Sequence, residues 1–236
     1  MYNKGMEYLS AFKAPIMQRY GGLSEVYLNW IDILLSLPAV FLAISFHEFA
    51  HALTAYWLGD PTPKNQGRLT LYPLAHVDWL GLILFVLFGF GWARPVQVNP
   101  SNFKSRKWGS IAVSLSGPLA NMLLALAALV VLVAAELFIF SYRAIVLGII
   151  DRVVQLNIVF AILNLIPIPP FDGYHIIKGL FYRRNAKFFW NFEYYGMFIL
   201  FAFIVLGGFK MLVHPPARYI YQQLMQLQSF LLSLLQ

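Results

Sequence analysis

One apolar stretch decides how this chain is built: residues 34–58 read LLSLPAVFLAISFHEFAHALTAYWL. A transmembrane helix needs about 20 such residues, so the stretch predicts a membrane-spanning helix. The same stretch carries His47, Glu48 and His51. These side chains are costly at membrane depth, and an apolar helix does not need them for packing. They are therefore the first candidates for a functional site.

The spacing of the two histidines predicts metal chemistry. Positions i and i+4 share one face of a helix, so the imidazoles of His47 and His51 can both point at one ion. Glu48 lies next to the first of them and can act as a base toward a water molecule at the metal. The chain contains no cysteine, so a zinc site has to use histidine, carboxylate and water. Metal-assisted hydrolysis is the chemistry that this spacing serves.

Composition indicates that the whole chain belongs in a membrane. The 236 residues are 60% hydrophobic and only 11% charged, whereas soluble proteins carry about 25% charged residues. The length allows about six spans and leaves little room for a separate soluble domain. The net charge of +7 is scattered between apolar runs. Such scatter is typical of positive loops at one membrane face, and it argues against nucleic-acid binding.

The apolar pattern predicts an all-α polytopic membrane protein with about four to six transmembrane helices. Short extended or re-entrant hairpin segments are expected near the active site, at 67–78 and 92–100, because Gly and Pro interrupt both stretches. The apolar stretch 79–92 between them, about 14 residues, is short for the hydrocarbon core. It is either a re-entrant piece or a short span in a thinned bilayer. Full spans are expected at 30–58, 109–138, 144–166 and 190–212.

Charge predicts the orientation. If the loops 59–78, 92–108 and 174–188 share one side, that side holds ten of the 17 Lys and Arg residues and the other side seven. An excess of basic residues favours the cytoplasmic face, which would place the active site toward the cytoplasm of a multi-pass cell-membrane protein. The ten are Lys64, Arg68, Arg94, Lys104, Arg106, Lys107, Lys178, Arg183, Arg184 and Lys187.

A third metal ligand has to come from elsewhere, because a catalytic zinc normally has three protein ligands and one open position. Most carboxylates of the chain lie beside basic or polar segments, as solvated loop residues do. Asp172 differs, because it follows a proline-rich break at the end of an apolar span, and Gly173 beside it permits unusual backbone geometry. Unwound backbone at membrane depth is tolerated where it lines a protein cavity. On the residues alone, Asp172 is either a ligand or a turn residue after a helix stop.

Three motifs follow one another along the chain. They are His47-Glu48-x-x-His51, Gly-Pro-x-x-Asn at 117–121, and Asn164-x-x-Pro167-x-Pro169-Pro170-x-Asp172-Gly173. In these motifs the chain resembles the site-2 protease family of intramembrane zinc metalloproteases, over roughly residues 40–180. The segments 67–78 and 92–99 are similar to its compact prokaryotic branch, which lacks PDZ and CBS domains.

The resemblance implies a role for each of five residues. His47, His51 and Asp172 would bind one zinc ion per chain. Glu48 would be the general base, and Asn164 would help to hold the scissile carbonyl or its oxyanion. The division of the chain then follows: an N-terminal surface or interfacial segment at 1–29, a membrane-embedded metalloprotease core at 30–213, and an apolar or interfacial helix at 214–236.

The expected function is that of an intramembrane zinc endopeptidase, which cleaves the transmembrane segment of another membrane protein in regulated intramembrane proteolysis. The alternative is a membrane transporter or non-catalytic scaffold that binds zinc. A base beside the first ligand favours hydrolysis, because a pure binder does not need one. A second enzyme family shares the pentapeptide and takes its third ligand from a later glutamate, here Glu136 or Glu193, but neither has that family's motif context.

Three further polar residues have simpler interpretations. Asn121 on an apolar helix is expected to join helices by hydrogen bonds, with a catalytic role as the alternative. His76 and Asp78 are expected to be hairpin residues, with an outer-shell or substrate contact as the alternative.

Overall fold

The computed structural model describes residues 30–88, 91–138, 143–181 and 185–235, so the predicted segment 1–29 lies outside the described residues. Within them the chain is helical, with one isolated β-bridge, and the predicted all-α class is confirmed. The α-helices are α3 (Trp30–Trp57), α4 (Thr62–Asn65), α5 (Trp79–Phe88), α6 (Arg106–Phe138), α7 (Arg143–Asn164), α8 (Asp172–Phe181), α9 (Ala186–Tyr194), α10 (Gly196–Val205) and α11 (His214–Leu235). Shorter helical turns are η1 (Pro73–Ala75), η2 (Pro100–Asn102) and η3 (Phe209–Val213).

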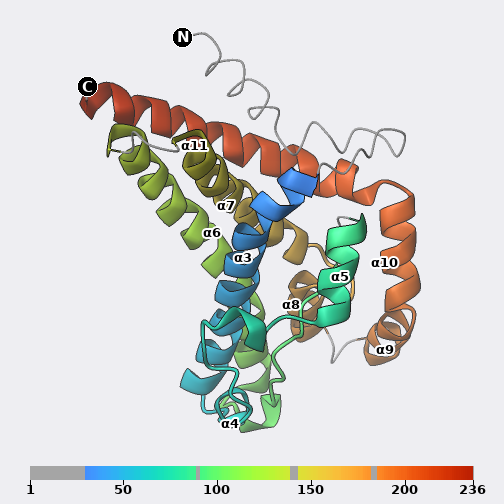
Figure 1. The fold of residues 1–236 in the computed structure, drawn as a ribbon. Helices are drawn as coiled ribbons and strands as arrows, with labels where there is room; N and C mark the ends of the chain where they lie inside the picture. The colour runs from blue at the N-terminus through green and yellow to red at the C-terminus, as the bar shows by residue number, and fades with distance from the viewer. Residues whose placement is uncertain (1–29, 89–90, 139–142, 182–184, 236) are drawn as a thin grey trace.

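Three long helices, α3, α6 and α7, are apolar enough to cross a membrane and contact one another side by side (Figure 1). They match the first three predicted full spans to within a few residues. At the fourth, expected at 190–212, the structure has two helices, α9 and α10, which meet at a bend of 61° and together are apolar enough for one broken span or a re-entrant loop. At the bend Gly196 lies so close to Pro169 that an added Cβ would come within 2.8 Å of the proline ring. The described residues thus hold three candidate spans, or four if the bent pair is one span, and four is the low end of the expected number.

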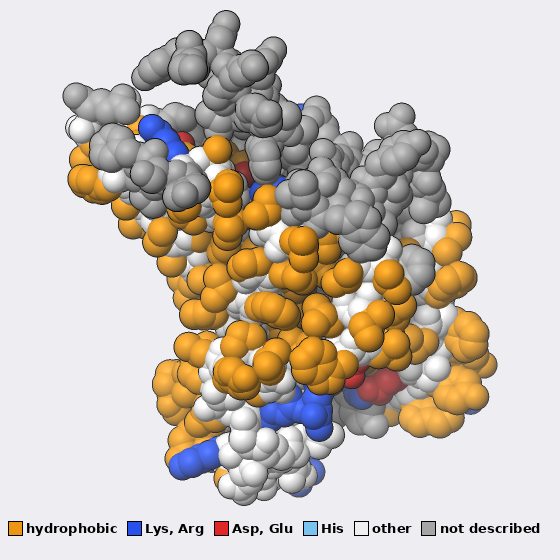
Figure 2. Space-filling model, viewed as in Figure 1, with side chains coloured by type: hydrophobic (Ala, Val, Ile, Leu, Met, Phe, Trp, Pro, Cys, Tyr) orange, Lys and Arg blue, Asp and Glu red, His pale blue; other side chains and the backbone are white. Residues whose placement is uncertain are grey.

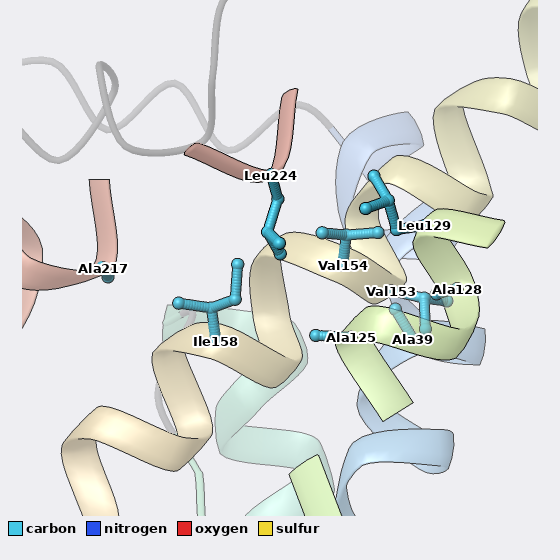
Figure 3. Packing of buried hydrophobic residues seen from close by; sticks show 9 residues of the cluster. All are labelled: Ala39, Ala125, Ala128, Leu129, Val153, Val154, Ile158, Ala217 and Leu224. Atoms are coloured by element: carbon cyan, nitrogen blue, oxygen red, sulfur yellow. The ribbon is translucent and has the colours of Figure 1, made fainter. Parts of the chain in front are cut away.

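Small side chains allow the long helices to approach closely. Lipid is as apolar as leucine, so helices in a membrane associate through close packing rather than through the hydrophobic effect. The principal cluster contains Ala39 of α3, Ala125 and Ala128 of α6 and Ala217 of α11 (Figure 3). Larger side chains such as Val154 and Ile158 of α7 fill the space between them. The C-terminal helix predicted over 214–236 is present as α11, packs on α6 and α7, and is not among the candidate spans.

The connection between α3 and α6 turns back on itself. The hairpin predicted over 67–78 does not form, because Pro73 begins the 3-10 turn η1 instead. The expected pairing with 92–100 is reduced to one bridge between Val77 and Ala93 and the hydrogen bond from the Arg94 N–H to the His76 carbonyl, 2.8 Å. Between these segments lies the short helix α5, which packs closely against the chain that follows it: a Cβ on Gly81 in its first turn would lie 2.1 Å from the Trp92 carbonyl oxygen.

Polar and apolar surfaces separate along the bundle. In Figure 2 hydrophobic side chains cover the middle of the visible face, and lysine and arginine side chains gather at the end that carries α4 in Figure 1. This distribution is typical of a protein whose middle faces lipid and whose basic end faces water.

Candidate metal centre

Helix α3 places both histidines on one buried face. His47 is 6% exposed and His51 is 8% exposed. Their Nε2 atoms lie 3.0 Å apart, as expected for residues i and i+4 that turn toward one point. The local sequence predicted this arrangement, because it depends only on helical spacing.

Asp172 lies beside the Nε2 atoms of both histidines, although it is distant from them in sequence. After α7 ends at Asn164, seven residues run without regular helix, and Asp172 then begins α8. Its Oδ2 atom lies 3.1 Å from His47 Nε2 and 3.2 Å from His51 Nε2. Gly173 allows this approach, since a Cβ there would come within 2.2 Å of the Leu165 carbonyl oxygen. The structure thus brings together the three residues predicted as ligands.

The outer nitrogens of both imidazoles are hydrogen-bonded. His47 Nδ1 lies 2.7 Å from Asn121 Oδ1, and His51 Nδ1 lies 2.7 Å from the Val113 carbonyl oxygen. A carbonyl oxygen accepts and cannot donate, so each Nδ1 carries the hydrogen. In the neutral imidazole, the form that binds metal, each Nε2 then keeps a lone pair that faces Asp172. Hydrogen bonding of this kind orients histidine as a metal ligand.

The three facing atoms fit a cation. Two Nε2 lone pairs and a carboxylate oxygen converge, and Asp172 Oδ2 is buried without a hydrogen-bond partner. Three acceptors in contact repel one another unless a positive ion lies between them. Their separations of 3.0–3.2 Å are close to the about 3.3 Å between ligands of a tetrahedral zinc with bonds of about 2.0 Å. Together they form a group that can hold a metal ion.

Gly117 of α6 leaves the space for this group. A Cβ at this position would lie 2.6 Å from His47 Cε1 and 2.6 Å from His51 Cε1 and Nε2. Any side chain at 117 would therefore enter the volume in front of the ligands. The motif Gly-Pro-x-x-Asn thus contributes Gly117 as open space and Asn121 as the partner of His47.

Glu48 is held by the segment that follows α5. Its side chain is buried, and its Oε2 atom accepts a hydrogen bond of 2.8 Å from the Val96 N–H. Among the described residues, the Glu48 carboxylate accepts no other hydrogen bond. Sequence spacing predicted that Glu48 lies beside the ligands, but it gave no sign that Val96 fixes the carboxylate.

Asn164 lies at the C-terminal end of α7. Its Nδ2 donates a 3.0 Å hydrogen bond to the Phe160 carbonyl one turn earlier, and the residue is partly buried. Its place directly before the unwound segment that leads to Asp172 keeps it a candidate for contact with substrate.

The remaining candidates lie outside the three-ligand group. His76 is fully buried and bonded through Nε2 to the Thr70 carbonyl, 2.8 Å, while Asp78 accepts the Gly81 N–H at the start of α5, 2.9 Å. Glu193, which the rival enzyme family would require as a ligand, pairs at the surface with Lys178 at 2.5 Å. Glu136 lies in the last turn of α6, about eight turns of helix from its N-terminus.

Two polar contributors were not predicted from sequence. Ser116 Oγ donates to the Val113 carbonyl, 2.7 Å, and so shares the acceptor of His51. Asn157 of α7 is fully buried and contacts Asn121. The available signal was a second asparagine two turns before Asn164 on an apolar helix.

A bundle of apolar helices that buries a His–His–Asp group with a neighbouring glutamate defines a membrane metalloprotein. The model for Peptidase family M50 matches residues 36–207, so this chain belongs to that family, and the resemblance to site-2 proteases is confirmed.

Two curated relatives carry names that begin "Putative zinc metalloprotease". YwhC of Bacillus subtilis (strain 168) is 43% identical over 145 residues, which are 59% of this chain and 66% of YwhC. Rip2 of Mycolicibacterium smegmatis (strain ATCC 700084 / mc(2)155) is 31% identical over 157 residues, 64% of this chain and 59% of Rip2. The match therefore spans less than two thirds of either relative. No solved structure matches the chain.

Proposed function

We propose that this chain is a zinc endopeptidase that cleaves transmembrane segments of other membrane proteins within the bilayer. The observation that carries the proposal is the convergence of His47, His51 and Asp172 beside Glu48 in helices apolar enough to span a membrane. Membership of Peptidase family M50 and the names of the two relatives support peptidase chemistry and zinc.

Each proposed ligand has a defined part. His47 and His51 present neutral Nε2 atoms, and Asp172 adds a carboxylate oxygen, so the group has one negative charge with which to bind a dication. A bound zinc ion would supply Lewis-acid polarisation of the scissile carbonyl and would lower the pKa of water toward about 7. Gly117 keeps the volume in front of these atoms open for water and a peptide group.

Glu48 performs the proton transfers in this proposal. The Val96 N–H holds Oε2, which directs the other oxygen, Oε1, to the attacking water. Glu48 takes a proton from that water and gives it to the nitrogen of the leaving amine as the peptide bond breaks. Asn164 at the end of α7 is proposed to donate its second Nδ2 hydrogen to the scissile carbonyl oxygen.

The proposed substrate is a membrane-spanning helix that unwinds locally, because a regular helix keeps its amides hydrogen-bonded and out of reach. The active site is proposed to face the cytoplasmic side, from the basic residues at the end of the bundle that carries α4.

The test uses the purified full chain in detergent, single-span model proteins as substrates, and the variant Glu48→Gln. We expect the parent to bind one zinc and to cleave in a zinc-dependent manner. Glu48→Gln should keep zinc, because it spares all three ligands, and should lose cleavage by about 10²-fold or more because it removes the base. Near-normal turnover by a zinc-loaded Glu48→Gln protein would refute the assigned role. Zinc binding by the parent without cleavage of any model substrate would instead favour the transporter or scaffold.

A further inference from the structure

A chain of buried amides links α7 to the metal ligand His47. Asn157 and Asn121 are both fully buried, although they lie on helices apolar enough to cross a membrane. Asn121 Nδ2 donates to Asn157 Oδ1 at 2.8 Å and to the Ala43 carbonyl at 2.9 Å. Asn121 Oδ1 then accepts from His47 Nδ1 at 2.7 Å. Both the NH₂ group and the oxygen of the Asn121 side chain are thus hydrogen-bonded.

The hydrogen bond of Asn157 to the backbone determines which group donates and which accepts along this series of amides. Asn157 Nδ2 donates to the Val153 carbonyl at 2.8 Å, and a backbone carbonyl can only accept. Asn157 must therefore present its oxygen to Asn121, and Asn121 must present its NH₂ group to Asn157 and its oxygen to His47. A carbonyl oxygen at His47 Nδ1 requires the hydrogen on that nitrogen and leaves the Nε2 lone pair toward Asp172.

We propose that Asn157 is a positioning residue for the metal site: through Asn121 it fixes the ring orientation and the tautomer of His47. The inference rests on the proposed function, because it assumes that His47 binds zinc. Asn157 does not touch the ligands, and it acts on His47 through a neighbouring helix. Loss of such outer partners typically lowers metal affinity by about 10- to 100-fold.

The experiment measures zinc affinity of the full chain in detergent by competition with a chelator. Asn157→Leu removes the hydrogen bonds to Asn121 and to the Val153 carbonyl. It replaces the amide by an apolar side chain of similar size. We expect its zinc affinity to fall by about 10- to 100-fold. Activity should return in part when zinc is added in excess, since the catalytic groups remain. Asn157→Ala has the same expected effect and serves if Asn157→Leu does not accumulate as folded protein.

The matched control is Val154→Ala, a fully buried neighbour on α7 that packs in the principal cluster and lies outside the amide chain. It should lower thermal stability and leave zinc affinity within about twofold of the parent. A double variant Asn121→Ala/Asn157→Ala should lose no more affinity than Asn121→Ala alone, because the effect of Asn157 passes through Asn121.

The outcomes separate the two proposals. If the parent fails to bind zinc through His47 and His51, the proposed function fails. If the parent binds zinc normally and both Asn157 variants match Val154→Ala in affinity, the positioning role of Asn157 is overturned and the proposed function stands.

Discussion

At the scale of single residues, Gly117 connects helix packing directly to the metal site. Alanine is the better helix former by about 0.5–1 kcal/mol, so helix propensity alone would favour Gly117→Ala. Its Cβ would nevertheless lie 2.6 Å from atoms of both imidazoles, and those rings are fixed by hydrogen bonds. We expect zinc binding and cleavage to be lost, because the rings must shift, and the zinc-free protein to lose about 1–3 kcal/mol of stability from overpacking.

Metal content and thermal unfolding of the Gly117→Ala protein check this expectation. Gly179→Ala is a useful control, because its Cβ would meet the Ile111 side chain, with Cγ1 at 2.9 Å, rather than a ligand. A Gly117→Ala protein with full zinc content would show that the space in front of the ligands is not needed.

Asp172 is the proposed ligand that local sequence defines least well, and a conservative change tests it. Asparagine suits turns as well as aspartate does, so Asp172→Asn should be harmless if the residue only ends the proline-rich break. As a ligand it supplies the negative charge. Its replacement should then lower zinc affinity by more than the about 10- to 100-fold that an outer-shell loss costs, and should abolish cleavage. Equilibrium zinc binding decides between the two, and an Asp172→Asn protein with parental affinity would exclude the ligand role.

At the scale of elements, the segment after α5 is held in place by Asp60. This fully buried carboxylate accepts hydrogen bonds from Thr62 N–H and Oγ–H, from Asn99 N–H at 2.7 Å and from Asn102 Nδ2 at 2.7 Å. Asn99 lies three residues after Val96, which bonds Glu48. Asp60 therefore joins the end of α3 to the segment that fixes the proposed base.

The variant Asp60→Asn should loosen this segment, because every partner of Asp60 is a donor and an amide would turn an NH₂ group toward at least one of them. We expect the free energy of unfolding at neutral pH to fall by about 1–3 kcal/mol and cleavage to fall with it. Asp78→Asn is the matched control, since that carboxylate accepts one N–H, from Gly81, and asparagine caps a helix equally well. Equal stability of the two variants would show that the hydrogen bonds of Asp60 do not hold this segment in place.

The same residue predicts a dependence on pH. Burial alone would raise the pKa of Asp60, but hydrogen bonds from Thr62, Asn99 and Asn102 outweigh it and hold the pKa below its usual value. A lowered pKa in the folded state means that Asp60 contributes its full stabilisation above the unfolded pKa of about 3.9 and loses it as pH falls through the folded value. The stability difference between parent and Asp60→Asn should therefore be constant near neutral pH and shrink below about pH 4. Thermal unfolding across this range measures it.

These contacts also limit how substrate could bind as an added strand. The N–H groups of Arg94 and Val96 already donate to His76 and Glu48. A peptide that pairs with the segment 91–99 would have to use the opposite edge of its backbone.

At the scale of the whole molecule, the basic end predicts the orientation in the membrane. Gln66 and Ser101 are exposed at that end, and Arg143 is exposed at the start of α7, one full span away. The natural chain has no cysteine, so single substitutions to cysteine give clean probes. We expect Gln66→Cys and Ser101→Cys to react with an impermeant reagent from the cytoplasmic side and Arg143→Cys from the outside. Labelling of the first two from the outside alone would reverse the proposed topology.

The sequence by itself determined the helical class, the three long spans, and His47, Glu48 and His51 as one candidate site, because each depends on composition or on spacing within one helix. Hydrophobic length predicts a span, and a separation of four residues predicts a shared helix face. The resemblance to site-2 proteases added Asp172 and Asn164 to this candidate site. The residues around Asp172 were equally compatible with a turn.

Contacts between segments that are distant in sequence came from the tertiary structure alone. The convergence of Asp172 with two histidines more than a hundred residues earlier, the bond from Val96 to Glu48 and the amide chain from Asn157 to His47 each join different parts of the chain. The hairpin expected at 67–78 was wrong, because Pro73 begins a 3-10 turn there. The apolar pattern at 190–212 predicted a span but not its bend at Gly196, which lies close to Pro169. Periodicity records which face of a helix is apolar, but the partner of that face is set by packing between segments that are distant in sequence.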